Sequence, residues 1–181
     1  TLYFNINKPS KINVLSINEA DDDYIKRIYT DDRFEYASSS LNQLNYSLIS
    51  DQNLLVLNEL QSINSSLNVA LNSFIKDGGS VVIIPSNEIV LSTYNQLINS
   101  FNISLNSKNE IARKITTINF DHPVFERVFD NKVKNFQFPK VESYYNLNSN
   151  QEPILKFENG STFLTASNNV FVFSSALNKE N

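Results

Sequence analysis

The chain has 181 residues, with 15 Lys and Arg against 19 Asp and Glu, a net charge of −4, and no Cys, Met or Trp. This length suits one domain with a sizeable core, since folding buries roughly 70% of the unfolded surface at this size. The acidic balance argues against a nucleic-acid surface, and the lack of Cys excludes disulfides, zinc–thiolate sites, iron–sulfur clusters and cysteine nucleophiles.

Because the chain starts at Thr1 and lacks Met, we expect it to be part of a longer translation product. We therefore expect residues 1–181 to form a single domain that was excised from a longer protein.

Strand and helix patterns alternate in the first hundred residues. Short β-branched or continuous apolar runs predict strands at residues 11–17, 34–38, 53–60 and 80–85. Three helices are predicted. The first follows Asp21-Asp22-Asp23, which would cap it, the second spans 65–76 and would end at Gly78-Gly79, and the third spans 88–101. This order implies right-handed crossovers and a mostly parallel sheet with helices on both faces, a three-layer α/β/α, flavodoxin-like layout.

The pattern changes beyond residue 103. Residues 103–150 are irregular, with many aromatic side chains and no long helix, and three apolar runs follow at 153–157, 162–166 and 170–174. Turn sequences separate these runs at Asn159-Gly160 and at Ser167-Asn168-Asn169. Because Asn-Gly between alternating apolar runs is a strong hairpin signal, we predict a C-terminal antiparallel hairpin at the edge of the parallel sheet.

The acidic cluster Asp21-Asp22-Asp23 invites comparison with the receiver domains of response regulators, which share this topology. A receiver needs a phosphoacceptor Asp at the end of its third strand, where this chain has Asn58, and Glu59 is out of register. Since an amide cannot form an acyl phosphate, a helix cap is the favoured interpretation of the cluster.

A class I glutamine-amidotransferase-like fold places its nucleophile on the turn after the strand at 80–85. Ser86 occupies that turn, and the single His of the chain, His122, would be its base. Ser86 lacks the flanking glycines of a nucleophile elbow, Ser86 or Asn87 could instead cap the next helix, and His122 precedes Pro123 in what reads as a packed loop. We expect no catalytic residues, with a divergent serine hydrolase using Ser86 and His122 as the enzyme alternative.

No metal or cofactor site is predicted. One His and no Cys leave only an all-oxygen metal site, and the carboxylates lack EF-hand spacing. Neither a Walker A string nor G-x-G-x-x-G occurs. A small-ligand or glycan site stays open as a hypothesis at the carboxyl ends of the strands, near Asn18, Asn58 and Ser86. For Tyr144-Tyr145 and Phe136-x-Phe138, packing is favoured over an exposed ligand surface.

Three strings together resemble a known family: KINVLSINEADDDYIKRIY at 11–29, NLLVLNELQSINSSLNVALNSFIKDGGSVVIIPS at 53–86, and INFDHPVFERVFDNKVKNFQF at 118–138. They resemble the soluble domain of the BatA-type membrane proteins of Bacteroidetes, an aerotolerance-associated group with an N-terminal double transmembrane segment. The resemblance implies a glutamine-amidotransferase-like domain without the amidotransferase nucleophile, and it supplies no catalytic residue.

The same resemblance implies membrane helices upstream of Thr1 and another segment downstream of Asn181. By the positive-inside rule, the domain would lie on the periplasmic side of the cell membrane. Implied partners are other Bat-type membrane proteins and an AAA ATPase of the MoxR type. We therefore expect a non-catalytic interaction or scaffold domain of a membrane-anchored envelope protein, with no cofactor and no nucleic-acid partner.

Overall fold

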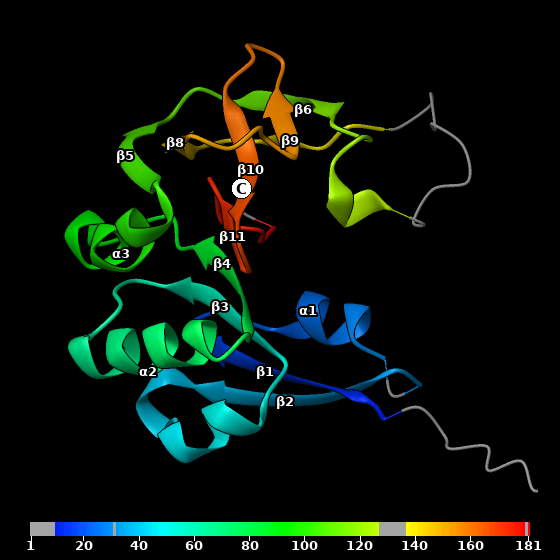
Figure 1. Cartoon of the computed structure of the whole chain (residues 1–181). Coiled ribbons are helices and arrows are strands. Elements are labelled where there is room, and N and C mark those ends of the chain that lie inside the picture. The colour runs from blue at the N-terminus through cyan, green and yellow to red at the C-terminus, as the bar shows by residue number, and fades with distance from the viewer. Residues whose placement is uncertain (1–9, 31, 127–136, 180) are drawn as a thin grey trace, which may run out of the picture.

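A sheet with the strand order β2-β1-β3-β4-β11-β10-β9-β6-β7 forms the middle layer of the domain (Figure 1). The computed structural model describes residues 10–30, 32–126, 137–179 and 181. The strands of this sheet are β1 (Ile12–Asn18), β2 (Phe34–Ser40), β3 (Leu54–Leu60), β4 (Ser80–Pro85), β6 (Arg113–Ile118), β7 (Lys140–Val141), β9 (Leu155–Phe157), β10 (Thr162–Ser167) and β11 (Val170–Phe173). A separate antiparallel pair consists of β5 (Ile103–Asn109) and β8 (Tyr144–Ser149).

The predicted three-layer α/β class is confirmed. Strands β2, β1, β3, β4 and β11 run parallel, and β10, β9, β6 and β7 continue the sheet in antiparallel pairs. The predicted C-terminal antiparallel hairpin is also confirmed: the Asn159-Gly160 turn joins β9 and β10, which pair antiparallel, and β10 pairs antiparallel with β11. This antiparallel part joins the parallel part where β11 pairs with β4, and β6 and β7, from the stretch predicted to be irregular, extend the sheet further outward.

The two faces of the sheet are covered unequally. Helices α2 (Ser65–Lys76) and α3 (Leu91–Ile98) pack on one face, together with the 3-10 segment η2 (Tyr46–Asp51). The other face carries α1 (Asp23–Ile28), which has six residues and is therefore only about 9 Å long. The described residues also contain the short 3-10 segments η1 (Leu41–Gln43), η3 (Asn99–Phe101) and η4 (Pro123–Phe125).

Helix α2 has the predicted bounds because its local signals are strong. The Asn64 side chain accepts a hydrogen bond from the Leu67 N–H at 2.8 Å, and Gly78 follows the helix with φ 97°. At α1 the N-cap residue is Asp22, whose side chain makes no capping hydrogen bond and accepts from the Tyr36 hydroxyl; Asp21, before it, accepts from the Asp23 N–H at 2.9 Å. The predicted side-chain cap is thus wrong, whereas Asp23 does place a negative charge in the first turn.

Helix α3 begins later than predicted, at Leu91, and no side chain caps it. The predicted capping role of Ser86 or Asn87 is therefore wrong. The Tyr145 hydroxyl on β8 accepts from the Ile89 N–H at 3.1 Å and donates to the Asn87 carbonyl at 2.8 Å. Because these bonds come from strand β8, which is distant in sequence, tertiary contact holds the segment before the helix as a loop.

The aromatic pair Tyr144-Tyr145 packs as predicted, since the two residues are 5% and 4% exposed. The Tyr144 ring lies 4.4 Å from that of Phe157, between centroids. Phe129 and Phe136 of the aromatic segment lie outside the described residues. Within the described part of the chain, no helix has the length and hydrophobicity needed to cross a membrane.

Candidate functional site

The carboxyl ends of β1 and β3 meet where the chain leaves the sheet in opposite directions, which is where open α/β sheets place ligands. Asn18 and Asn58 lie there, 8% and 3% exposed. Asn18 accepts from the Ser16 hydroxyl at 2.7 Å and donates to the Ser38 hydroxyl at 3.0 Å. Asn58 donates to the Asp21 carbonyl at 3.2 Å. Both amides therefore fasten strands and loops to each other.

Glu59 is the unusual residue of this edge. It is 7% exposed and has φ 53°, a left-handed conformation that costs a residue with a Cβ about 1–2 kcal/mol. The β3–β4 register shifts between Asn58 and Leu60, so Glu59 forms a bulge, and its carboxylate accepts from the Asn178 amide at 2.6 Å. Residues held in such conformations concentrate at functional sites. Sequence reasoning considered Glu59 only as an out-of-register phosphoacceptor, because no local signal marks the bulge.

The structure does not pair Ser86 with His122. Ser86 follows the carboxyl end of β4, whereas His122 follows β6, which lies four strand positions away, or about 19 Å. The Nδ1 atom of His122 accepts from the Val124 N–H at 3.2 Å and caps η4, as expected of a hydrogen-bonded loop residue. His122 borders a small cavity with Asn119, Gln151 and Glu152, and Ser86 is not part of that lining.

A cavity of about 400 Å³ does lie at the carboxyl edge, between α1 and the end of the chain. Its lining mixes both signs of charge, from Asp21, Asp23, Arg27 and Lys179, and both cations stand 5.9 Å from the centre of the Tyr24 ring. None of the three predicted residues, Asn18, Asn58 or Ser86, lines it. This charged cavity is therefore not the apolar site that was predicted near those three residues.

One electrostatically perturbed pair at this edge is Asp22 and Tyr36, where the Tyr36 hydroxyl donates to Oδ2 of Asp22 at 2.7 Å. Partial burial raises the pKa of Asp22, but hydrogen bonds from Ser38 and Tyr36 outweigh it and hold this pKa below its ordinary value. Burial and the neighbouring carboxylate raise the pKa of Tyr36. In the described ranges, no three His, Asp or Glu side chains gather closely enough to hold a metal ion.

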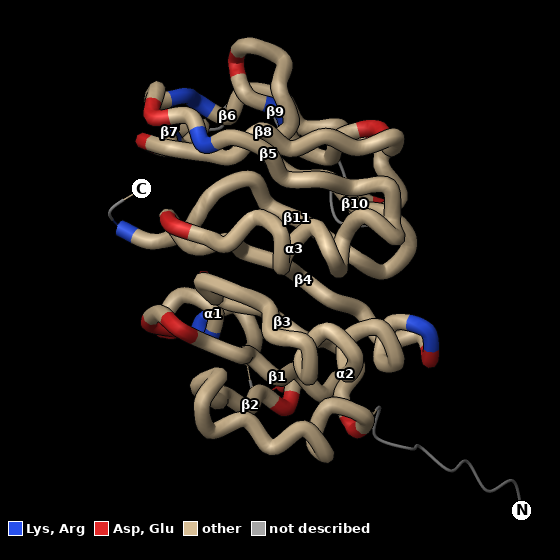
Figure 2. The backbone as a smooth tube through the Cα atoms, turned by 90° about the vertical axis from the view of Figure 1, so that its left-hand side faces the viewer, with Lys and Arg blue, Asp and Glu red and all other residues tan. Residues whose placement is uncertain are grey.

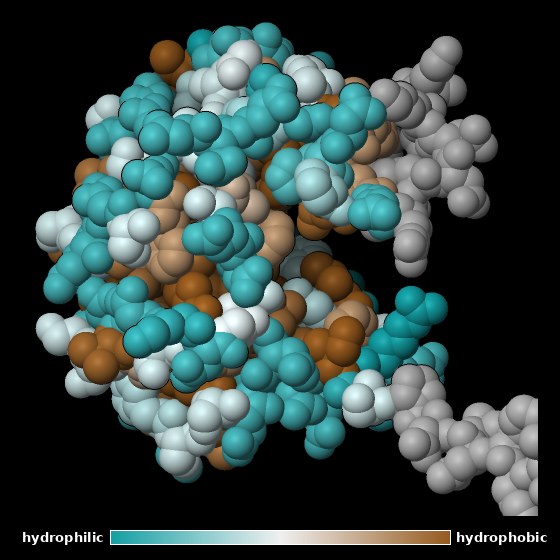
Figure 3. All heavy atoms as spheres, viewed as in Figure 1, coloured by the Kyte–Doolittle hydropathy of each residue, from teal (hydrophilic) through white to brown (hydrophobic). Residues whose placement is uncertain are grey.

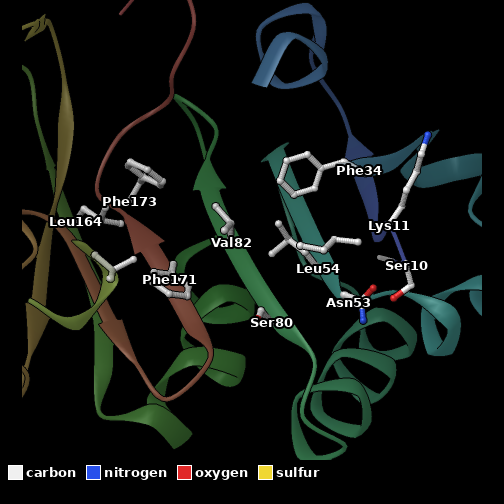
Figure 4. A pocket seen from close by; sticks show the side chains of 12 residues that line it. Ser10, Lys11, Phe34, Asn53, Leu54, Ser80, Val82, Leu164, Phe171 and Phe173 are labelled. Atoms are coloured by element: carbon white, nitrogen blue, oxygen red, sulfur yellow. The ribbon is translucent and has the colours of Figure 1, made fainter. Parts of the chain in front are cut away.

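An apolar groove of about 700 Å³ is the other candidate, on the face of the sheet that carries α1 (Figure 4). Alternate residues of β1, β3 and β4 point to this face. Helix α1 covers the carboxyl-side members Val14, Val56 and Ile84, which are 0%, 2% and 4% exposed. The amino-side members lie beyond its end and form the groove floor with residues of β2, β10, β11 and η4: Ile12, Leu54, Val82, Phe34, Leu164, Phe171, Phe173 and Val124.

The groove opens to the surface, where Figure 3 shows hydrophobic atoms in a hollow of the molecule. Polar residues border it at the amino ends of the strands: Ser10, Lys11, Asn53 and Ser80. Elsewhere Lys and Arg are scattered among Asp and Glu along the described backbone, without a basic stripe (Figure 2). The groove is therefore the site whose chemistry is most distinct from the rest of the surface.

Comparisons with known proteins place the fold. No family model matches the chain, and neither does any curated protein sequence. A putative ThuA-like protein from Bacteroides uniformis ATCC 8492 superposes with a TM-score of 0.64 at 10% identity, over 96% of this chain and 86% of that one. A glutamine amidotransferase from Thermotoga maritima gives a TM-score of 0.60 at 10% identity, over 91% and 75%.

A β-galactosidase from Marinomonas ef1 gives a TM-score of 0.53 at 12% identity, covering 81% of this chain and 20% of the much longer enzyme. The chain thus spans about a fifth of that relative. At such identities the likeness concerns the fold alone. Together with the sheet topology, these likenesses define a glutamine-amidotransferase-like α/β domain.

Proposed function

We propose that this chain is a non-catalytic interaction domain of a membrane-anchored, Bat-type envelope protein, and that the groove beside α1 is its binding surface. The observation that carries the proposal is the open apolar face, where Ile12 is 44% exposed among other apolar side chains. Clustered apolar side chains on a rimmed surface are typical of binding sites.

The carboxyl edge of the sheet, with Asn18, Asn58 and Ser86, supports the same proposal. Asn18 and Asn58 are buried and bonded to the chain's own groups, and Ser86 has no histidine partner in the described structure. The Bat-type assignment rests on the three sequence strings quoted above. With it come the proposed periplasmic location and the proposed partners, other Bat-type membrane proteins and a MoxR-type ATPase.

Cysteine protection tests the binding surface, because the chain has no native Cys. Ile12→Cys places a thiol in the groove, and Val69→Cys, at a 71% exposed position of α2 on the opposite face, is the matched control. Each variant is labelled with a maleimide twice, in the isolated domain and in the full-length protein in its native membrane.

Assembly should slow labelling at residue 12 at least tenfold relative to the isolated domain and leave residue 69 unchanged. Equal labelling rates at residue 12 in both settings would remove the groove as the binding surface.

A further inference from the structure

Strand β2 is one end of the nine-stranded sheet (Figure 1). It pairs with β1 through seven residues in one continuous register, and no other strand of the described residues lies beyond it. An edge strand carries a row of N–H and C=O groups that can pair with another chain. Lys, Pro and β-bulges usually prevent such pairing, and β2 contains none of them.

The hydrogen-bonding direction alternates along β2. The Ile12 N–H on β1 donates to the Arg33 carbonyl at 3.0 Å, so the odd-numbered residues turn their backbone groups toward β1. The even-numbered residues Phe34, Tyr36 and Ser38 therefore turn theirs outward. The Phe34 N–H donates to a carbonyl of the preceding turn at 3.1 Å. In the described part of the chain, the N–H and C=O groups of Tyr36 and Ser38 make no hydrogen bond, so they are open to an added strand.

Aromatic side chains lie beside this edge on the face that carries α1. The Tyr29 ring lies 5.1 Å from the Phe34 ring and 6.1 Å from the Tyr36 ring, between centroids. Phe34 also lines one end of the groove (Figure 4). The opposite face of β2 carries Glu35 and Ala37, which are exposed. Because an added strand would lie about 4.8 Å from β2, every second side chain of it would lie beside the aromatic cluster, next to the groove.

From these observations we propose that the protein partner of this domain adds an extended strand to the outer edge of β2. Its side chains alternate between apolar and polar, and the apolar ones face the aromatic cluster and the groove. The open backbone groups select this occupant, because another extended backbone supplies donors and acceptors at the matching spacing. A helix already satisfies its own backbone groups and cannot pair with the edge. The inference rests on the proposed function, because it names how the same partner binds.

Hydrogen exchange read residue by residue tests strand addition directly. In the isolated domain, the Tyr36 and Ser38 amides should exchange about tenfold or more faster than those of Ala37 and Ser39, which point toward β1. In the full-length protein in its native membrane, the Tyr36 and Ser38 amides should slow by about tenfold or more, whereas those of Ala37 and Ser39 should change little.

Ser38→Pro and Ser38→Ala form a matched pair of variants. Both remove the hydroxyl that accepts from the Asn18 amide at 3.0 Å, but only Pro removes the outward N–H and obstructs the edge. In the Ile12→Cys chain, Ser38→Pro should return maleimide labelling in the membrane to the rate of the isolated domain, and Ser38→Ala should keep the protection of the parent. Circular dichroism verifies that each variant is folded, and the exchange measurement needs no variant.

Tyr36 and Ser38 amides that exchange equally fast in both settings would overturn the proposal. If residue 12 is still protected in the membrane, the groove remains the binding surface and only strand addition fails. If residue 12 is labelled freely as well, the proposed function fails with it. Protection of Tyr36 and Ser38 in the isolated domain that follows its self-association in analytical ultracentrifugation would also overturn the proposal, and would assign the edge to a second copy of this chain.

Discussion

The backbone at Gly79 lies close to the Phe74 ring of α2, a contact that the sequence does not reveal. A Cβ atom at Gly79 would stand 2.3–2.5 Å from three ring atoms of Phe74, whereas carbon atoms in contact prefer about 3.5–4.0 Å. The ring would have to retreat by about 1 Å or more. Phe74 is only 6% exposed and packs in the core under α2. The space open to the displaced ring is a cavity of about 250 Å³ that Phe74 and Gly79 both border, and moving into it takes the ring out of its core contacts.

We predict that Gly79→Ala lowers the free energy of unfolding by about 1–3 kcal/mol, the usual cost of overpacking, offset in part by about 0.4–1 kcal/mol from lower entropy of the unfolded chain. In the double variant Gly79→Ala/Phe74→Leu the smaller side chain removes the clash. The double-mutant cycle should therefore show a coupling energy of about 1–2 kcal/mol.

Urea unfolding followed by far-UV circular dichroism measures all four chains, which suits a protein without Trp. Gly160→Ala is the control, because no atom lies within 4 Å of its added Cβ and only its positive φ of 85° opposes the substitution. It should show no coupling to Phe74→Leu. A neutral or stabilising Gly79→Ala with zero coupling would refute the reasoning.

Two further predictions concern the carboxyl edge. Hydrogen bonds lower the pKa of Asp22 in the folded state. The stabilisation of the fold by the ionised Asp22 is therefore present above its unfolded pKa of about 4 and is lost as pH falls through the folded pKa. Asp22→Asn should weaken the acid dependence of urea unfolding between pH 6 and pH 2, and an unchanged profile would contradict this. If the domain is non-catalytic, a fluorophosphonate probe should label the parent chain and Ser86→Ala equally weakly by mass spectrometry, and labelling that Ser86→Ala or His122→Ala abolishes would favour the hydrolase alternative.

Local signals in the sequence determined the parallel half of the domain. The apolar runs that became β3 and β4, and helix α2 with its Asn64 cap and Gly78 end, carry their own periodicity and stop signals. The Asn159-Gly160 turn likewise identified the hairpin before β10, with Gly160 at φ 85°. These features need only neighbouring residues, and so sequence alone was sufficient.

Pairing between distant segments decided the rest. The β-branched run at 115–118 in β6 (RKITTI) is a strand signal that the sequence prediction missed. The two-residue β7 (KV) carries no such signal, and its order comes from pairing with β6. The late start of α3 depends on the hydrogen bonds of Tyr145. The left-handed conformation of Glu59 depends on a register shift between β3 and β4.

The candidate groove likewise depends on how elements that are distant in the sequence pack together. Ile12, Leu54 and Val82 read as core residues of three strands, and the sequence does not say that a six-residue α1 stops short of them. Burial of a strand residue depends on which element packs above it, and helix length and placement set that cover in three dimensions. The sequence therefore determined which side chains face this layer, and only the tertiary structure decided that α1 does not cover them.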